Sequence, residues 1–330
     1  MKNWLTSIWY RNEPPPAALQ PLTTLYRRLA RRNATQNQAE AVHLPVPVII
    51  VGNIAVGGTG KTPFVIWLIE TLRELGWRPG VVSRGYGGRA PAYPLRVTAA
   101  TSPLHAGDEP ALVAQRTGAP VAVAPDRVAA AQLLLAEGGV DVLIADDGLQ
   151  HYRLARDLEF CVVDGSRGIG NGCCLPAGPL REPPERLAQV DLLVINGALT
   201  VPLPADTAPQ VAMRLNIEHA RRLRDSTERA LADFSGQRVH AVAGIGNPER
   251  FFSALRSRGI EVIAHPFPDH YRYADVDLCF DDDLPVLMTE KDAVKCGGFD
   301  IPDLWAVPAT PTLAADDAAR VRQLLDRLRR

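Results

Sequence analysis

The stretch Val48–Thr62, VIIVGNIAVGGTGKT, decides the fold. Its apolar start, Val48–Val51, predicts a strand that is buried on both faces. A glycine-rich turn follows, and Lys61 then opens an amphipathic helix. Glycines let backbone N–H groups turn inward, and a helix N-terminus carries partial positive charge, so this order predicts a phosphate cradle. The candidate nucleotide-binding residues are Gly57, Gly58, Thr59, Gly60, Lys61 and Thr62.

Within this cradle we expect Lys61 to reach the β- and γ-phosphates and the Thr62 hydroxyl to ligate magnesium. The usual pattern has glycine where this chain has Ala55. The alternative is an ordinary glycine-rich turn, which would leave a lysine unexplained at a helix start, where positive charge is disfavoured. The flanking strand and helix are the context that the motif requires, and they favour the phosphate site.

The composition of the chain limits the classes of function. The 330 residues suit one large domain or two moderate ones, and the formal net charge of −1 gives no sign of nucleic-acid binding. The five cysteines form no CxxC pair, which favours a reducing compartment. We find no apolar run near the roughly 20 residues that a membrane span needs, and no signal peptide.

The N-terminal region predicts two helices. Residues 1–10 place Trp4, Ile8 and Trp9 on one helical face, and a second helix is expected at 17–33, ending in an arginine cluster. Indole rings beside arginines suit a membrane interface with anionic headgroups. From these residues alone, helices packed on the body of the protein, with solvated arginines, are equally compatible with the pattern.

Two further segments carry candidate ligand contacts. The loop 84–89 follows a strand at 80–83, and its Arg84 and Tyr86 could close over an anionic or sugar-like ligand, or could simply be solvated. Asp108 and Glu109 stand at the start of a short helix, where capping is the plain interpretation.

Carboxylates follow the apolar strand at 140–145. Asp146 and Asp147 stand where P-loop folds hold magnesium or its water shell, and adjacent aspartates would repel without a nearby cation. An Asp-Gly turn is the alternative. Gln150 and His151 continue this loop, and Arg181, in a glycine- and proline-rich stretch at 170–183, could meet a phosphate.

The alternation of apolar strands and helices predicts a P-loop NTPase-type α/β fold with a doubly wound, mostly parallel sheet. Its chemistry should collect at the carboxyl ends of the strands. A proline-rich boundary at 197–209 precedes a second, smaller α/β domain. We therefore expect N-terminal helices at 1–40, a P-loop domain at 41–205, and a smaller domain at 206–330.

Several stretches together resemble one family, the tetraacyldisaccharide 4′-kinases of lipid A biosynthesis. They run in the family's order over nearly the whole chain, which makes the set far more specific than a P-loop alone. The matching pieces are 51–53 through 61–63, SRGYG at 83–87, GDEP at 107–110, DDGLQH at 146–151, LPAGPLRE at 175–182, FPDH at 267–270 and TEKD at 289–292.

The resemblance implies ATP-dependent phosphorylation, with Mg²⁺, of the 4′-hydroxyl of a tetraacyldisaccharide 1-phosphate, giving lipid IVA. It also implies a peripheral protein at the cytoplasmic face of the bacterial inner membrane, held there by the N-terminal helix. The alternative is a P-loop kinase or ligase of a soluble small molecule, because the loop also resembles that of the MinD and dethiobiotin synthetase class. Val56 stands where that class's ATPases carry their signature lysine, which disfavours an ATPase switch of that kind. A nucleotide-gated membrane binder without catalysis is a second alternative.

The family's functional residues map onto named positions of this chain. The resemblance assigns Asp108, paired with His270, as the catalytic group, with Lys61 and Arg181 on the phosphates. The implied metal residues are Thr62, Asp146 and Asp147; the implied nucleotide contacts of the second domain are Glu290, Lys291 and Asp292; the substrate candidates are Arg84, Tyr86, Gln150 and His151. Since Asp108 and His270 fall in different expected domains, catalysis would require the domains to close.

Overall fold

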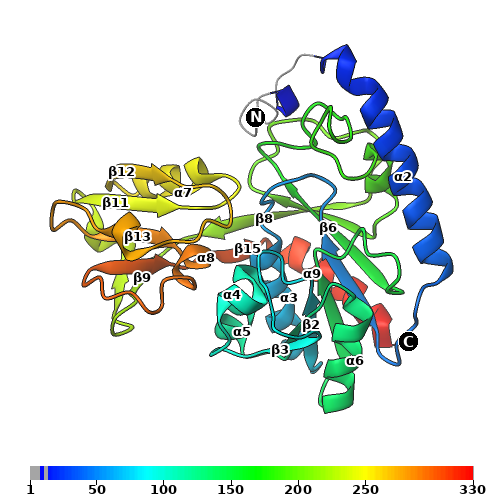
Figure 1. The fold of residues 1–330 in the computed structure, drawn as a ribbon, viewed down its shortest axis with the longest axis horizontal. Coiled ribbons are helices and arrows are strands. Elements are labelled where there is room, and N and C mark those ends of the chain that lie inside the picture. Colours follow the sequence, from blue (N-terminus) through cyan, green and yellow to red (C-terminus); the bar gives the residue numbers. More distant parts are fainter. Residues whose placement is uncertain (1–7, 11–13, 330) are drawn as a thin grey trace.

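The computed structural model describes residues 8–10 and 14–329, and Figure 1 shows two lobes, each built on its own sheet. Within the described residues the large sheet has nine strands, parallel except for the two edge strands β15 and β3. In spatial order they are β15 (Thr310–Leu313), β8 (Gln210–Asn216), β7 (Leu192–Asn196), β6 (Leu158–Asp164), β1 (Val48–Gly52), β5 (Val142–Asp146), β2 (Pro79–Ser83), β4 (Val121–Val123) and β3 (Leu95–Val97).

Strand β1 lies in the middle of this sheet and is buried along its whole length. Because successive side chains of a strand point to opposite faces, Ile49 and Val51 enter one hydrophobic core, and Val48 and Ile50 enter the other. Helices α3 (Lys61–Glu74), α5 (Asp108–Thr117) and α9 (Ala315–Asp326) contribute to the first core. Helix α6 (Arg127–Glu137), the 3₁₀ turn Pro184–Ala188 and Tyr26 of α2 (Gln20–Ala39) contribute to the second. The predicted doubly wound α/β fold is confirmed.

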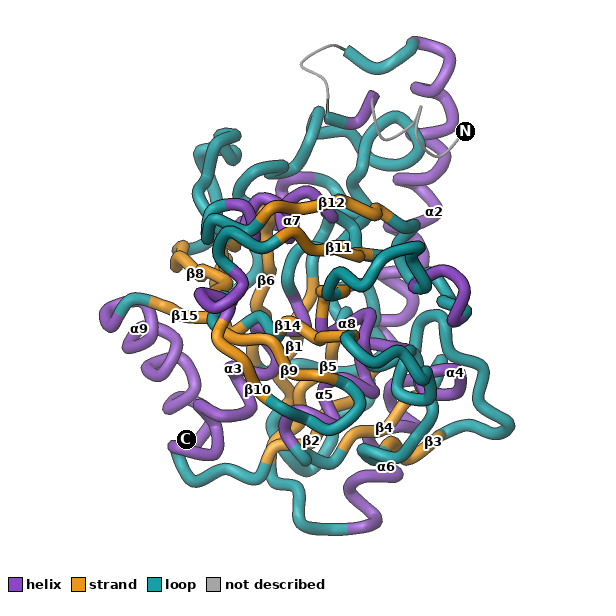
Figure 2. Tube along the Cα trace, turned by 90° about the vertical axis from the view of Figure 1, so that its left-hand side faces the viewer, coloured by secondary structure: helices purple, strands orange, loops and turns teal. Residues whose placement is uncertain are grey.

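The small domain carries six strands within the described residues. They are β10 (Glu228–Ala230), β9 (His219–Arg222), β14 (Leu304–Val307), β13 (Val286–Thr289), β11 (Arg238–Ala243) and β12 (Glu261–Pro266). Its helices are α7 (Pro248–Arg256) and the single turn α8 (Glu290–Ala293). In Figure 2 the small domain faces the viewer, in front of the large sheet.

The sheet topology corrects the predicted division at 205/206. Strands β8 and β15 pair with each other at the edge of the large sheet, and α9 buries Val321 and Leu325 in the large core. The small domain is therefore an insertion between β8 and β15. An amphipathic helix shows that one face is buried, but not which of two sheets it covers.

The N-terminal predictions have separate outcomes. Most of the helix expected at 1–10 lies outside the described residues, although Ile8 and Trp9 are described and helical. The helix expected at 17–33 forms as a 3₁₀ turn, Ala17–Leu19, followed by α2, which continues to Ala39. Figure 1 shows α2 along the side of the large lobe that lies away from the small domain. Among the described helices, none combines the length and the apolar character that crossing a bilayer requires.

Candidate active site

The P-loop forms where β1 ends and α3 begins. Gly60 precedes α3 with a φ of 93°, in the left-handed region that favours glycine, and a Cβ there would lie 2.2 Å from Asn196 Nδ2. That same amide nitrogen donates to the Thr59 carbonyl over 2.9 Å. A Cβ on Gly246 of the small domain would lie 2.4 Å from the Gly58 backbone nitrogen. Glycines are thus needed both for the turn and for the close approach of the two domains.

A cavity of about 200 Å³ opens over this loop between the two domains. The large domain contributes the P-loop, including Lys61 and Thr62, together with Glu109. The small domain contributes its loop at 245–247 and the start of α8, with Glu290 and Lys291. This arrangement suits a nucleotide whose phosphates lie on the P-loop and whose remainder is covered by the small domain.

Asp147 accepts two cations. Its carboxylate lies 3.4 Å from Lys61 Nζ and 3.0 Å from Arg181 Nη1. Burial opposes ionisation, but Lys61 and Arg181 outweigh it and hold the pKa of Asp147 well below its usual range. Lys61 and Arg181 therefore provide positive charge beside Asp147.

Asp146 has a different environment from its neighbour. It is 2% exposed, and its Oδ1 has no hydrogen-bond partner among the described residues. Burial, reinforced by the negative charge of Glu109, raises its pKa to about 7. An unpartnered buried carboxylate oxygen on the strand next to the P-loop fits a divalent cation. Within the described part of the chain no three His, Cys, Asp or Glu side chains converge as a metal site.

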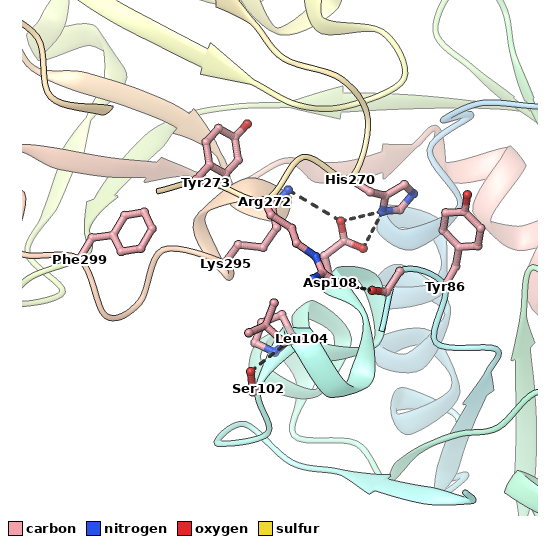
Figure 3. Close-up of a pocket in the computed structure, with 11 residues that line it drawn as sticks. Tyr86, Ser102, Leu104, Asp108, His270, Arg272, Tyr273, Lys295 and Phe299 are labelled. Atoms are coloured by element: carbon pink, nitrogen blue, oxygen red, sulfur yellow. Dashed lines mark hydrogen bonds and ion pairs between the residues drawn. The ribbon is translucent and has the colours of Figure 1, made fainter. Parts of the chain in front are cut away.

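The second cavity, of about 250 Å³, contains a pair of side chains from the two domains (Figure 3). His270 Nδ1 lies 2.9 Å from Asp108 Oδ2 and 3.0 Å from Oδ1. Asp108 is in the first turn of α5, and His270 is in the loop after β12. An ionised carboxylate can only accept, so Nδ1 of the neutral imidazole carries the proton. Tyr86 packs edge-on against the imidazole, with the ring centroids 4.9 Å apart.

The charges around this pair favour its ionised form. Burial opposes ionisation of Asp108, but the hydrogen bond with His270 and the nearby Lys291 and Lys295 lower its pKa. For His270, burial acts to lower the pKa, but the bond to Asp108 raises it overall. Lys295 Nζ lies 3.9 Å from Asp108 Oδ2. Asp108 is therefore a carboxylate at neutral pH, with its partner fixed in orientation.

Comparison with known proteins identifies the family. The family model described as tetraacyldisaccharide-1-P 4′-kinase matches residues 16–329. The chain belongs to this family. The tetraacyldisaccharide 4′-kinase of Pseudomonas putida (strain W619) is 50% identical over 316 residues, covering 94% of this chain and 93% of that protein. The corresponding kinase of Nitrosococcus oceani is 50% identical over 96% of this chain and 93% of that protein.

A solved structure supports the same conclusion. The crystal structure of LpxK from Aquifex aeolicus in complex with ATP has a TM-score of 0.79 to this chain at 30% identity, and covers 94% of this chain and 98% of that one. The chain is a kinase of lipid A biosynthesis, as the resemblance implied. The two alternatives, an enzyme of a soluble small molecule and a non-catalytic membrane binder, are thereby set aside.

In this tetraacyldisaccharide 4′-kinase, three of the expected site residues have side chains that contact other parts of the protein and line neither cavity. Asp292 is fully buried and accepts from Gly244 N, Thr289 Oγ1 and Lys295 Nζ, so it supports the small domain and does not line the nucleotide cavity. Gln150 Nε2 donates to Glu182 and to the Asn53 carbonyl. His151 lies against Asp126, and burial lowers its pKa to about 4. Neither Gln150 nor His151 lines either cavity.

The two remaining substrate candidates differ in position. Arg84 is exposed, whereas Tyr86 lines the second cavity beside His270. Sequence reasoning also missed two cationic residues of the site, Lys295 near Asp108 and Arg127 near Asp147. Arg127 opens α6 and donates to the Asp147 carbonyl over 3.1 Å. A cation at a helix start is disfavoured, so the signal that singled out Lys61 was present at Arg127 too.

Proposed function

We propose that this kinase transfers the γ-phosphoryl group of ATP to the 4′-hydroxyl of tetraacyldisaccharide 1-phosphate across the first turn of α5. One observation carries the proposal. Asp108 lines the cavity that holds His270, and the next residue, Glu109, lines the cavity over the P-loop. The two cavities meet at neighbouring residues, so a hydroxyl beside Asp108 can approach a phosphate bound on the P-loop.

In this arrangement Asp108 takes the proton of the 4′-hydroxyl as that oxygen attacks phosphorus. His270 holds the carboxylate through its Nδ1–H and turns it toward the cavity. Phosphoryl transfer requires little covalent chemistry from the protein, so most of the barrier is lowered by position and charge. Lys61 and Arg181, both beside Asp147, provide positive charge for the phosphate oxygens.

Thr62 and Asp146 are the residues that would hold magnesium. When bound, Mg²⁺ neutralises the charge of the phosphates. The Thr62 hydroxyl stands in the first turn of α3, and the buried Asp146 provides the unpartnered oxygen. Asp147 supports this site indirectly, because its pairing with Lys61 and Arg181 holds both cations at the end of β5.

The proposal also includes the membrane. Helix α2 exposes Leu22, Leu25 and Leu29, each more than half accessible, and the neighbouring Arg28 and Arg32 are exposed as well. An apolar stripe flanked by arginines suits peripheral contact with an anionic bilayer surface, such as the cytoplasmic face of the inner membrane. The acyl chains of the acceptor lipid make such contact useful to the reaction.

A double-mutant cycle tests the catalytic pair. Asp108→Ala and His270→Ala should each lower kcat about 10²–10⁴-fold, the usual contribution of a positioned acid or base. The double variant should be little slower than the slower single variant, because residues of one catalytic unit are strongly non-additive. The measurement is ATP turnover that depends on the lipid acceptor, with the melting temperature of each variant recorded in parallel.

Asp126→Ala is the matched control, because Asp126 caps α6 by accepting from Val128 N over 3.1 Å. It should cost about 1 kcal/mol of stability and leave kcat near the wild-type value. If Asp108 is only a helix cap, its variant will resemble this control. Rate losses that are additive and follow thermal destabilisation would exclude the catalytic pair.

A further inference from the structure

The N-terminal elements contact one segment of the large domain, residues 170–181. The indole N–H of Trp9 donates to the Pro176 carbonyl over 3.0 Å. The buried Thr23 of α2 accepts from Ala177 N over 3.2 Å. One turn later, the hydroxyl of Tyr26 donates to the Arg181 carbonyl over 3.0 Å. Helix α2 therefore holds the segment that ends in Arg181.

The same segment is bonded on its other side to the entry of the P-loop. Arg181 N donates to the Ile54 carbonyl over 2.6 Å, and Val56 N donates to the Pro179 carbonyl over 2.8 Å. The backbone of Arg181 is thus fixed at its N–H by the segment after β1 and at its carbonyl by Tyr26. The segment lies outside regular strands and helices, so its position depends on individual bonds of this kind.

The side chain of Arg181 continues the connection into the phosphate site. Its Nη1 lies 3.0 Å and 3.1 Å from the two carboxylate oxygens of Asp147. Asp147 in turn lies 3.4 Å from Lys61 Nζ in the P-loop. A continuous series of contacts therefore runs from the Tyr26 hydroxyl through Arg181 and Asp147 to Lys61.

We propose that Tyr26 is a positioning residue for the kinase reaction, which holds the backbone of Arg181 so that its guanidinium meets the transferring phosphate. The proposal rests on the proposed function of Arg181. It gives α2 a role in catalysis that is separate from membrane contact. Tyr26 is half-buried against the core of the large domain, whereas the leucine stripe of the same helix is exposed. One helix therefore serves both the phosphate site and the lipid surface.

The test is Tyr26→Phe, which keeps the ring and removes the hydroxyl. We expect kcat to fall about fivefold, the size of one lost hydrogen bond at a partly buried site. The KM for the lipid should be unchanged, and the melting temperature should fall by only a few degrees, because one lost hydrogen bond costs about 1 kcal/mol of stability. The assay uses the full chain and tetraacyldisaccharide 1-phosphate in non-ionic detergent micelles, so that membrane binding does not contribute. Thr24→Ala is the matched control, because it removes a hydroxyl that bonds within α2, to the Gln20 carbonyl.

The decisive comparison uses Arg181→Ala as a second background. If Tyr26 acts through Arg181, Tyr26→Phe should cause no further loss of kcat in the Arg181→Ala protein. Additive losses, or an equal fall in kcat for Thr24→Ala, would overturn the positioning role. A normal kcat for Tyr26→Phe beside a slow Arg181→Ala would also overturn it, while the proposed function would stand. A normal kcat for Arg181→Ala would contradict the role of Arg181 itself.

Discussion

Backbone conformation at single residues marks the candidate site. Among the described residues, the non-glycine residues with positive φ are Asp147 (49°), Ser226 (60°) and His270 (61°). Two of these three belong to the site, and left-handed conformations outside glycine are costly unless surrounding contacts hold them. Asp147 is held by Lys61 and Arg181, and His270 by Asp108. Backbone strain is thus concentrated at site residues whose side chains need a fixed orientation.

The pKa of Asp146 makes a prediction about stability. Its pKa is raised to about 7 in the folded protein, above the ordinary value of 3.8. Between these two values the folded state binds more protons than the unfolded state, so stability falls as the pH rises through this window. Asp146→Asn removes the free-energy cost of ionising a buried carboxyl group. We therefore expect the gain in unfolding free energy over the wild type to be larger at pH 8 than at pH 5. Denaturant unfolding without nucleotide measures the stability of the wild type and of the variant at each pH. A stability gain that is independent of pH would contradict the raised pKa.

At the scale of elements, α5 shows how one helix start serves two cavities. From the local pattern alone, capping is the plain interpretation of Asp108 and Glu109, and acidic residues are indeed favourable in a first turn. The structure pairs both with the small domain, Asp108 with His270 and Glu109 with Lys291 Nζ at 2.7 Å. These contacts, rather than capping alone, explain why two carboxylates stand together at this helix start.

Helix α2 carries the prediction about the membrane. The replacement of Leu22, Leu25 and Leu29 by Ser should weaken binding to phosphatidylglycerol vesicles, because it removes the exposed apolar stripe. Stability should change little, since these side chains are already solvated. Val276→Ser is the control, because Val276 is 76% exposed but lies on the small domain. Co-sedimentation measures the effect, and equal binding of the wild type and the triple variant would exclude α2 as the contact.

The first indole of the N-terminal region, Trp4, lies outside the described residues, and the second does not belong to the leucine stripe. Trp9 donates to Pro176 O, and its own carbonyl accepts from Asn171 N over 2.8 Å. A change at Trp9 therefore disturbs the segment that leads to Arg181. The leucine variants separate membrane contact from catalysis better than variants of Trp9 would.

At the scale of the whole molecule, two short connections join the domains. Residues 217–218 lead from β8 into the small domain, and residues 308–309 lead back to β15. They lie side by side because Asn216 pairs with Thr310 (Figure 1). Ion pairs such as Lys291 with Glu109 also join the domains, and we propose that the small domain rotates over the P-loop about this two-stranded connection.

The ion pair between Arg116 and Glu290 is the interdomain contact to test. Arg116 Nη1 on α5 lies 2.6 Å from Glu290 Oε2 on α8, and both side chains are largely buried. Arg116→Glu should raise the KM for ATP about tenfold, equivalent to roughly 1.4 kcal/mol, with a smaller change in kcat. The charge-swapped protein, Arg116→Glu with Glu290→Arg, should recover much of the loss. If the swap leaves the KM as high as the single variant does, the pair does not hold the domains closed.

The sequence by itself determined the elements that depend on local order. The P-loop follows from apolar residues, then glycines, then a helix, because these residues set the backbone locally and bury β1 on both faces. The ordered motifs determined the family for the same reason, since they are read along the chain. The strands expected at 80–83 and 140–145 are also present, as β2 and β5, whereas β3, β8 and β15 were not predicted.

Only the tertiary structure decided which distant residues meet. Asp108 and His270 are 162 positions apart, and their hydrogen bond depends on how two domains pack. No local pattern specifies that β8 and β15 join the large sheet or that α9 packs in the core of the large domain. The burial of Asp292 likewise depends on distant partners. Tyr26 shows this most clearly: its hydroxyl meets the carbonyl of Arg181, 155 residues away. Such contacts form because the chain closes around a shared core, and hydrophobic periodicity records that a face is buried without recording against what.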